Sequence, residues 1–316
     1  MAIDIKKSQD VYKDAGESII FTTLMLKKDD LKHDQEVIQE FSDLSNSIIN
    51  SMRIRQDPQP ISVALGFGSD AWDYLFPNAP KPKELDNFQE IKGPKYTAIS
   101  TPGDIFIHVR AQQMSICYEL IEQFMGILRP ITTVEDETHG FRYFEGRSII
   151  GFIDGTENPA GVESMDYTLI DSDEDAEFVN GSYAFAQKYI HKMTDWNGLK
   201  TEDQEKAVGR HKFNDRELED DEKLPNAHNI VSKDEVDGVE NKIVRMNVPF
   251  SDPAQNITGT YFIGYSKTFT ITNRMLTKMF TESDRLLDFS TPVTGSLFFI
   301  PSKDTLDKII DGEYYI

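Results

Sequence analysis

The sequence predicts an α+β fold made of duplicated ferredoxin-like units with antiparallel sheets. Short segments with alternating apolar residues, typical of strands, are separated by amphipathic segments typical of helices. One such strand–helix pair occurs twice: PGDIFIHVRAQQMSICYELIEQFM begins at Pro102, and TGTYFIGYSKTFTITNRMLTKMF begins at Thr258. The aligned pairs include Gly103 with Gly259, Phe106 with Phe262 and Phe124 with Phe280. Matches in one register indicate an internal duplication.

The first half contains the elements of one ferredoxin-like unit in order. SIIFTTLML (18–26) is predicted as a strand, and residues 29–50 as a helix whose acidic start suits the helix dipole. ISVALGFG (61–68) is the second predicted strand. The strand and helix of the repeat follow, and FRYFEG, from Phe141, reads as the closing strand.

The second half gives the same order, β-α-β-β-α-β. Its predicted strands and helices are a strand at 183–191, a helix at 201–210, a strand at 241–250, the repeat from Thr258, and a strand from Ser296. We therefore expect an N-terminal half (1–146), a connecting segment (147–180) and a C-terminal half (181–316).

Two irregular segments interrupt this plan: the connecting segment and a long insert at 211–240. Long loops in compact domains are usually functional or disordered. We therefore look for the functional residues in these two segments and beside them.

Composition excludes several classes of function. The 316 residues carry 54 acidic and 33 basic side chains, a net charge of −21, which disfavours binding to nucleic acid or anionic membranes. No apolar run is long enough for a membrane span, and the first residues do not resemble a signal peptide. The single cysteine, Cys117, excludes an internal disulfide and a cysteine-based metal cluster. We expect a cytoplasmic protein.

The stretch GFIDGTENP, in the connecting segment, places one carboxylate at the end of an apolar run. Asp154 follows SIIGFI and precedes a turn-forming sequence. A carboxylate in that position either caps the turn or points into a cavity.

One of the six histidines stands out by its location. No pair has the HxxxH or HExxH spacing of a zinc site on one helix. His228 lies in the long insert, in LPNAHNIVSK. A histidine chosen at random is more often a surface or hydrogen-bonded residue than a ligand. A single ligand histidine in a nearly thiol-free chain nevertheless suits haem iron, which one protein nitrogen can hold.

The predicted strand KIVRMNVPF carries two polar side chains on one face. Arg245 and Asn247 alternate with apolar residues, so they point the same way and need partners. One interpretation is a salt bridge at a sheet edge, with Asp154 as the partner. The other is peroxide chemistry, in which the three side chains move a proton, stabilise developing charge and orient the substrate.

The segment ESDRLLDFSTPVTG contains two further carboxylates. Asp284 and Asp288 are four residues apart and share a face if the segment is α-helical. Both are either solvated or capping residues, or Asp288 accepts the ring N–H of a ligand histidine.

Taken together, these motifs resemble the dye-decolourising peroxidases, particularly their cytosolic bacterial group. The resemblance covers nearly the whole chain and includes, in order along the sequence, GDIFIHVRA, GFIDGTENP, HNIVSK, KIVRMNVPF and DRLLDFSTPVTGSLFFIP. It implies two ferredoxin-like halves of the dimeric α+β barrel superfamily, which agrees with the internal repeat. It also implies haem b as cofactor, hydrogen peroxide and small organic one-electron donors as substrates, and a homo-oligomer.

The resemblance also implies roles for individual residues. His228 would be the proximal ligand of the haem iron, with Asp288 hydrogen-bonded to its ring. Asp154 would lie on the distal side at the mouth of the cavity, Arg245 would be its partner, and Asn247 would orient peroxide. Further residues that it places near the haem are Arg210, which would help bind it, and Glu217 and Glu240, which could attract Mn²⁺. We expect an acidic pH optimum.

Two other functions stay open at this point. A haem carrier or haem-handling protein could show incidental peroxidase activity, and related ferredoxin-like proteins degrade haem and release iron. The pair Asp154 and Arg245 distinguishes the peroxidase, because a carrier does not need it. Without these motifs, the sequence would suggest only an acidic duplicated protein with no cofactor.

Overall fold

The computed structural model describes residues 3–13 and 16–315, and its main feature is one antiparallel sheet. Along the sheet the order is β10-β11-β7-β13-β2-β5-β1-β6, and β12 also pairs with β7. The strands are β1 (Ser18–Leu26), β2 (Ile61–Phe67), β5 (Ile105–Ala111), β6 (Thr132–Phe141), β7 (Ser182–His191), β10 (Val244–Asp252), β11 (Ile257–Ser266), β12 (Ser290–Pro292) and β13 (Ser296–Ile300).

The strand order confirms the predicted duplication. In the first half the four strands lie in the order β6-β1-β5-β2, and in the second half β13-β7-β11-β10. In both halves the fourth strand lies beside the first, the first beside the third, and the third beside the second. The halves meet where Phe299 of β13 pairs with Phe67 of β2.

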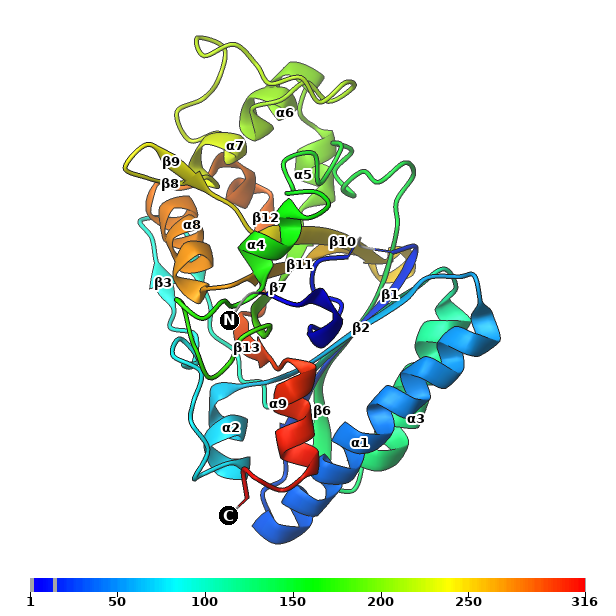
Figure 1. The fold of residues 1–316 in the computed structure, drawn as a ribbon. Helices are drawn as coiled ribbons and strands as arrows, with labels where there is room; N and C mark the ends of the chain where they lie inside the picture. The colour runs from blue at the N-terminus through cyan, green and yellow to red at the C-terminus, as the bar shows by residue number, and fades with distance from the viewer. Residues whose placement is uncertain (1–2, 14–15, 316) are drawn as a thin grey trace.

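The helices of the first half pack directly on its strands. Helix α1 (Leu31–Gln56) begins after Asp30, whose carboxylate accepts the backbone N–H groups of Lys32 and His33. It lies beside α3 (Met114–Leu128), and the two form one layer of the molecule (Figure 1). The apolar face of α3 is buried against β1 and β5, as its amphipathic pattern predicts.

The remaining elements are short. They include α2 (Ser69–Leu75), α9 (Lys303–Ile310), the hairpin β3 (Ile91–Lys92) and β4 (Thr97–Ala98), and the 3-10 helices η1 (Ile5–Lys7), η2 (Pro253–Gln255) and η3 (Arg285–Asp288). Also among them are α4 (Glu163–Thr168) in the connecting segment, and α5 (Met193–Asn197), α6 (Thr201–Val208), α7 (His228–Val231) and the hairpin β8 (Asp234–Val236) and β9 (Val239–Asn241) in the second half. The second half also contains the longer helix α8 (Phe269–Thr281).

Several predicted boundaries differ from the structure: the first helix covers Leu31–Gln56 rather than 29–50, and the strand predicted at 241–250 begins at Val244. Two further differences have a clear physical cause. The closing strand of the first half ends, rather than begins, at Phe141, because β6 pairs with β1 and finishes opposite Ser18. The helix predicted at 201–210 ends at Val208, because Gly209 adopts the left-handed conformation, with φ of 89°. A Cβ at Gly209 would lie 1.7 Å from Oδ1 of Asn229, so only glycine fits there.

A core of aromatic side chains joins the two halves. The Phe21 ring of β1 stacks on Tyr261 of β11, with ring centroids 3.9 Å apart, and on His108 of β5. Nδ1 of His108 lies 2.8 Å from the Tyr265 hydroxyl, so this buried histidine has a hydrogen-bond partner. The core lies on the side of β10 and β11 that carries Met246, Val248 and Tyr261. The opposite face of these strands lines the functional site.

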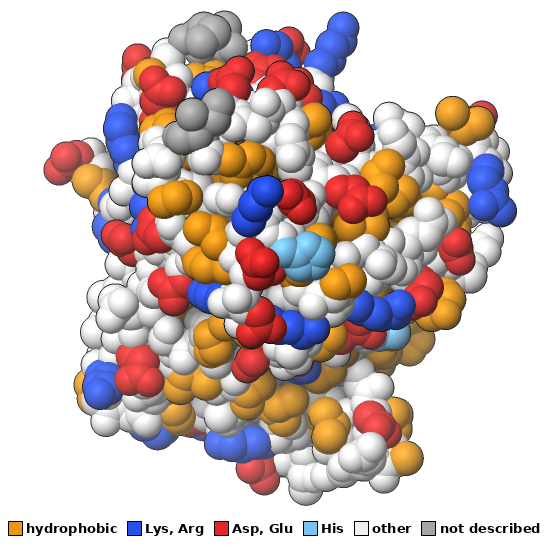
Figure 2. Space-filling model, turned by 90° about the horizontal axis from the view of Figure 1, so that it is seen from below, with side chains coloured by type: hydrophobic (Ala, Val, Ile, Leu, Met, Phe, Trp, Pro, Cys, Tyr) orange, Lys and Arg blue, Asp and Glu red, His pale blue; other side chains and the backbone are white. Residues whose placement is uncertain are grey.

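The surface and the helices agree with the composition. Figure 2 shows acidic and basic side chains interspersed with apolar ones on the face that it draws. Within residues 3–13 and 16–315, we find no helix with the length and apolar character needed to span a membrane.

The close approach of β6 to β10 gives a stability prediction. A Cβ at Gly140 would lie 2.3 Å from Cγ1 of the buried Val248 and 3.2 Å from the Pro249 carbonyl oxygen. We expect Gly140→Ala to lower the free energy of unfolding by about 1–3 kcal/mol, measured by urea denaturation. Gly126→Ala is the control, because nothing lies within 4 Å of its added Cβ in helix α3. It should stabilise the protein by about 0.5–1 kcal/mol. Equal changes in the free energy of unfolding for Gly140→Ala and Gly126→Ala would contradict the close approach of β6 to β10.

Candidate functional site

A large cavity lies between the second-half strands and the helices α7 and α8. It holds about 1570 Å³ of empty space, including its open mouth. Strands β7, β10 and β11 form one wall, and the first turns of the insert and the GFIDGTENP loop close part of the rim. Its apolar lining includes Ile150, Phe152, Ile243, Phe262, Met275, Leu276 and Leu287. A cavity of this size and character suits a large, flat, mostly apolar ligand.

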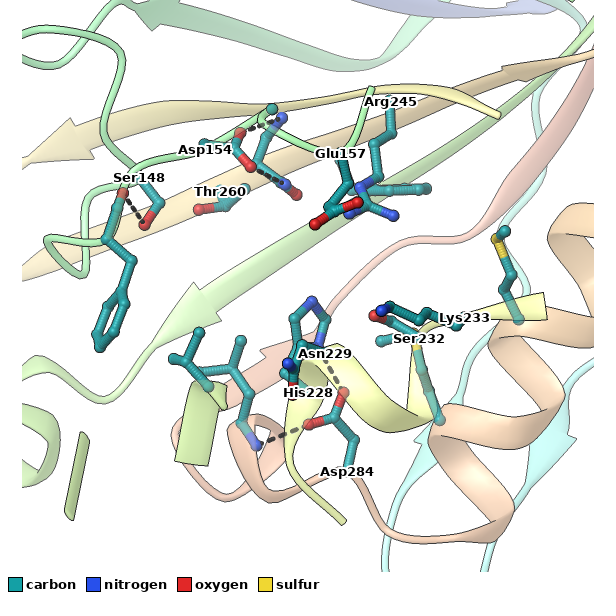
Figure 3. Close-up of a pocket in the computed structure, with 18 of the residues that line it drawn as sticks. Ser148, Asp154, Glu157, His228, Asn229, Ser232, Lys233, Arg245, Thr260 and Asp284 are labelled. Atoms are coloured by element: carbon teal, nitrogen blue, oxygen red, sulfur yellow. Dashed lines mark hydrogen bonds and ion pairs between the residues drawn. The ribbon is translucent and has the colours of Figure 1, made fainter. Parts of the chain in front are cut away.

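His228 lies at one side of the cavity, held by a buried carboxylate. It is the first residue of the short helix α7, and its Nδ1 lies 2.7 Å from Oδ2 of Asp284. Asp284 is fully buried, and its other oxygen accepts the backbone N–H of Leu286 at 2.8 Å. The carboxylate therefore fixes the ring, with Nδ1–H as the hydrogen-bond donor. Nε2 carries a free lone pair and faces the cavity (Figure 3).

The prediction that Asp288 holds the histidine ring is wrong. Asp288 instead forms ion pairs with Arg285 and Lys95 and accepts a hydrogen bond from Tyr96. That role was implied by the family resemblance. The separate expectation that Asp284 and Asp288 share a face assumed an α-helix, whereas residues Arg285–Asp288 form the 3-10 helix η3. Asp284 caps the start of η3 and Asp288 ends it, so the two carboxylates do not share a face.

Asp154 lies on the opposite wall of the cavity. Its Oδ1 accepts a hydrogen bond from Nδ2 of Asn247 at 3.0 Å, and its Oδ2 accepts the Asn247 backbone N–H at 3.3 Å. Asp154 is half-buried in the cavity wall, and the partial removal of solvent from its carboxylate raises its pKa above the ordinary value of 3.8. The hydrogen bonds from Asn247 and the charge of Arg245 oppose that increase. The carboxylate of GFIDGTENP therefore points into a cavity.

Arg245 and Asn247 share the cavity face of β10, as the alternation predicts. Their neighbours Val244, Met246 and Val248 are buried on the other face. In the part of the chain that the structure describes, no ion pair joins Arg245 to Asp154. The salt-bridge interpretation is therefore wrong, and Figure 3 shows Arg245 and Asp154 side by side above His228.

Arg210 lies at the cavity rim, between two carboxylates. Its guanidinium forms ion pairs with Glu157 and Asp215 and donates to the Asp215 backbone oxygen at 2.9 Å. Thr156 donates to the Asp215 carboxylate at 2.6 Å. These bonds tie the GFIDGTENP loop to the insert, two segments that sequence analysis could not place together.

The carboxylates considered for Mn²⁺ do not form a cluster. Glu217 is bonded to Lys223 and Asn229, whereas Glu240 lies on the hairpin strand β9 at the cavity. Among residues 3–13 and 16–315, no group of three or more His, Cys, Asp or Glu side chains is placed to hold a metal ion.

Sequence analysis missed two polar residues of the site. His191 lines the cavity, with its ring nitrogens 2.8 Å from the hydroxyls of Ser290 and Thr260, and burial lowers its pKa to about 4. Its place at the end of a predicted strand gave no signal. Asn158 bonds to the backbone of Arg245, and its signal was its position in the same loop as Asp154.

Comparison with known proteins agrees with this geometry. The family model for the N-terminal part of Dyp-type peroxidases matches residues 8–142, and the model for the C-terminal part matches residues 145–305. A dye-decolorizing peroxidase from Mycobacterium tuberculosis is 45% identical over 270 residues, which cover 83% of this chain and 79% of that protein.

Solved structures show the same fold. A dye-decolorizing peroxidase from Bacteroides thetaiotaomicron superposes with a TM-score of 0.90 at 50% identity, covering 96% of this chain and 98% of that one. A DypB variant from Rhodococcus jostii RHA1 in complex with heme gives a TM-score of 0.89 at 39% identity, covering 93% and 96%. The chain therefore belongs to the Dyp-type peroxidase family and is a haem peroxidase.

Proposed function

We propose that His228 is the protein ligand of the haem iron and that Asp154, Arg245 and Asn247 act on peroxide from the opposite wall. The observation that carries this proposal is the position of the His228 imidazole, held by Asp284, across the cavity from the half-buried carboxylate of Asp154 and the guanidinium of Arg245. The residues fit haem: the lining is mostly apolar, and Nε2 of His228 is a single nitrogen donor whose ring is oriented by Asp284. When bound, haem supplies the iron centre that peroxide oxidises and that organic donors then reduce.

Asp154 is suited to hold and return a proton. In its ionised form, the carboxylate accepts a proton from hydrogen peroxide at the oxygen that faces the cavity. Asn247 keeps the carboxylate in place through its side chain and its backbone N–H. The raised pKa of Asp154 brings its proton affinity closer to the working pH, so the same group can also give the proton back.

Arg245 supplies positive charge that does not depend on pH. A guanidinium keeps its proton at any pH at which the protein is folded. It stabilises negative charge that develops on the peroxide oxygens, in a cavity whose apolar lining, including Phe152 and Phe262, strengthens electrostatic interactions. Proton transfer is therefore assigned to Asp154 and charge stabilisation to Arg245.

We also infer the setting in which the enzyme works. The net charge of −21 favours neutral or cationic organic donors over anionic dyes. We propose a cytoplasmic location, which the composition favours, and a homo-oligomer, which the family resemblance implies. The halves 1–146 and 181–316 would be its two ferredoxin-like units. Haem transport and iron release are not favoured, because neither needs the arrangement of Asp154, Asn247 and Arg245.

The first test compares variants of the proposed ligand and its carboxylate. The wild-type protein loaded with haem should show a Soret band that His228→Ala loses or shifts, since the iron then lacks its nitrogen ligand. Asp284→Asn removes the charge beside the ring and should weaken haem binding about 10- to 100-fold. Asp288→Asn is the matched control and should leave haem affinity unchanged. Haem titration followed by absorbance measures all four proteins.

The opposite results are equally clear. A wild-type protein that stays colourless after haem is supplied would exclude the proposed site. Equal losses in Asp284→Asn and Asp288→Asn would show that the hydrogen bond from His228 to Asp284 does not matter for haem binding.

The second test concerns the peroxide step. Asp154→Ala and Arg245→Ala should bind haem normally, whereas their second-order rate with hydrogen peroxide should fall about 10²- to 10⁴-fold and 10²- to 10³-fold respectively. Stopped-flow absorbance in the Soret region gives these rates. Normal rates in both variants would favour the haem-handling alternative.

The third test uses pH. Because Asp154 accepts the proton in its ionised form, the wild-type rate should fall as pH decreases through its pKa, which burial raises above 3.8. Asp154→Asn should lose this acidic limb. The free energy of unfolding of the haem-free protein should show the opposite trend, because the native state binds this proton more tightly than the unfolded chain. The stability that Asp154 contributes is therefore complete below pH 3.8 and lost as pH rises through the raised pKa. A peroxide rate that keeps rising above neutrality would contradict this assignment.

A further inference from the structure

Strand β10 is at the end of the sheet, and among residues 3–13 and 16–315 no strand pairs with its outer edge. In an antiparallel pair, alternate residues direct their backbone N–H and C=O groups away from the partner strand. Arg245 and Asn247 are alternate residues, and their outward groups meet side chains of the GFIDGTENP loop. Backbone groups in the wall of a cavity need such partners.

Asn158 provides both partners for Arg245. Its Nδ2 donates to the Arg245 carbonyl oxygen at 2.6 Å, and its Oδ1 accepts the Arg245 N–H at 3.0 Å. One planar amide thus takes the place of a neighbouring strand at this residue. The Asn158 backbone is itself fixed, because its N–H donates to the Gly155 carbonyl oxygen at 3.1 Å in a tight turn in which Gly155 has φ of 80°.

Other bonds of the loop lead elsewhere. Thr156 and Glu157 bond to Asp215 and Arg210 of the insert and do not reach β10. Two side chains, those of Asp154 and Asn158, therefore attach the loop to β10. Asp154 reaches Asn247, and Asn158 reaches Arg245, so the loop and the strand are held at two adjacent outward positions.

We propose that Asn158 is a positioning residue for the peroxide reaction, whose side-chain amide sets the location of Arg245 relative to Asp154. This inference rests on the proposed roles of Arg245 and Asp154. An error of about 1 Å in the placement of a catalytic group can cost on the order of 10² in rate. The two groups come from segments far apart in the chain, and the Asn158 clip, the two hydrogen bonds between Asn158 and Arg245, fixes their separation.

An asparagine is required because the clip needs a donor and an acceptor in one short planar group. Alanine offers neither. An ionised aspartate keeps the acceptor for the Arg245 N–H but turns an oxygen toward the Arg245 carbonyl oxygen, which repels it. A protonated aspartic acid restores a donor, so Asn158→Asp should regain function as the pH falls.

The test uses haem-loaded wild type, Asn158→Ala, Asn158→Asp and the control Thr156→Ala, which removes a bond from the same loop to the insert. Hydrogen–deuterium exchange should become faster in peptides covering residues 244–250 of Asn158→Ala and stay unchanged in residues 182–190. Thr156→Ala should leave exchange at 244–250 as in the wild type. The Soret band of every variant should match that of the wild type, because His228 and Asp284 are untouched.

Peroxide kinetics provide the second readout. Asn158→Ala should react with hydrogen peroxide about 10- to 100-fold more slowly than the wild type. The rate of Asn158→Asp relative to wild type should rise as pH falls, whereas the relative rate of Asn158→Ala should change little. A purely structural role would not produce this pH-dependent rescue.

Each contrary outcome has a defined meaning. Unchanged exchange at residues 244–250, or a relative rate of Asn158→Asp that does not vary with pH, would overturn the proposal. If Asn158→Ala does not fold, Asn158→Asp at acidic and neutral pH supplies both readouts in one protein. If Arg245→Ala reacts with peroxide normally, the proposed function of Arg245 is wrong, while the exchange experiment still decides whether the clip exists.

Discussion

The free outer edge of β10 is the constraint on which the site depends. A strand edge leaves backbone donors and acceptors unpaired, and in a cavity wall water cannot reliably replace a partner. Here side chains of the 154–158 loop occupy the edge instead of another strand. The hydrogen bonds that pair the outer backbone groups of β10 therefore bring Asp154 next to the strand that carries Arg245. The unpaired edge of β10 therefore accounts both for the packing of the loop on the sheet and for the position of the Asp154 carboxylate in the cavity.

The carboxylates on the two walls of the cavity, Asp284 and Asp154, have different surroundings. Asp284 faces an imidazole N–H and a backbone N–H, which both donate to it and fix its orientation. Asp154 receives two hydrogen bonds from Asn247 and the field of Arg245, yet burial still raises its pKa. The first carboxylate serves as a fixed anion that orients a ligand. The second can change its protonation state, as proton transfer requires.

Much of this arrangement could be predicted from local sequence patterns. Alternation placed Arg245 and Asn247 on one face, and the internal repeat predicted that both halves share one order of strands and helices along the chain. The choice of Asp288 over Asp284 failed because the two carboxylates lie in one short segment, and only the fold shows that Asp284 is the one buried against His228. The roles of Asn158 and His191 depend on contacts across 87 and 69 positions, to Arg245 and Thr260 respectively, and no local pattern reports such contacts.

The duplication also explains why the cavity lies in only one half. Strand β2 occupies the same position in its unit as β10, but β2 is paired with β13, so its edge is covered. In the first half the long helix α1 packs with α3 over the sheet, and apolar side chains fill the space. Its counterpart in chain order, α6, has 8 residues and contacts mainly α7 and η3. Without a long helix on that side, the sheet of the second half keeps room for a cofactor and a free edge for the loop that carries Asp154.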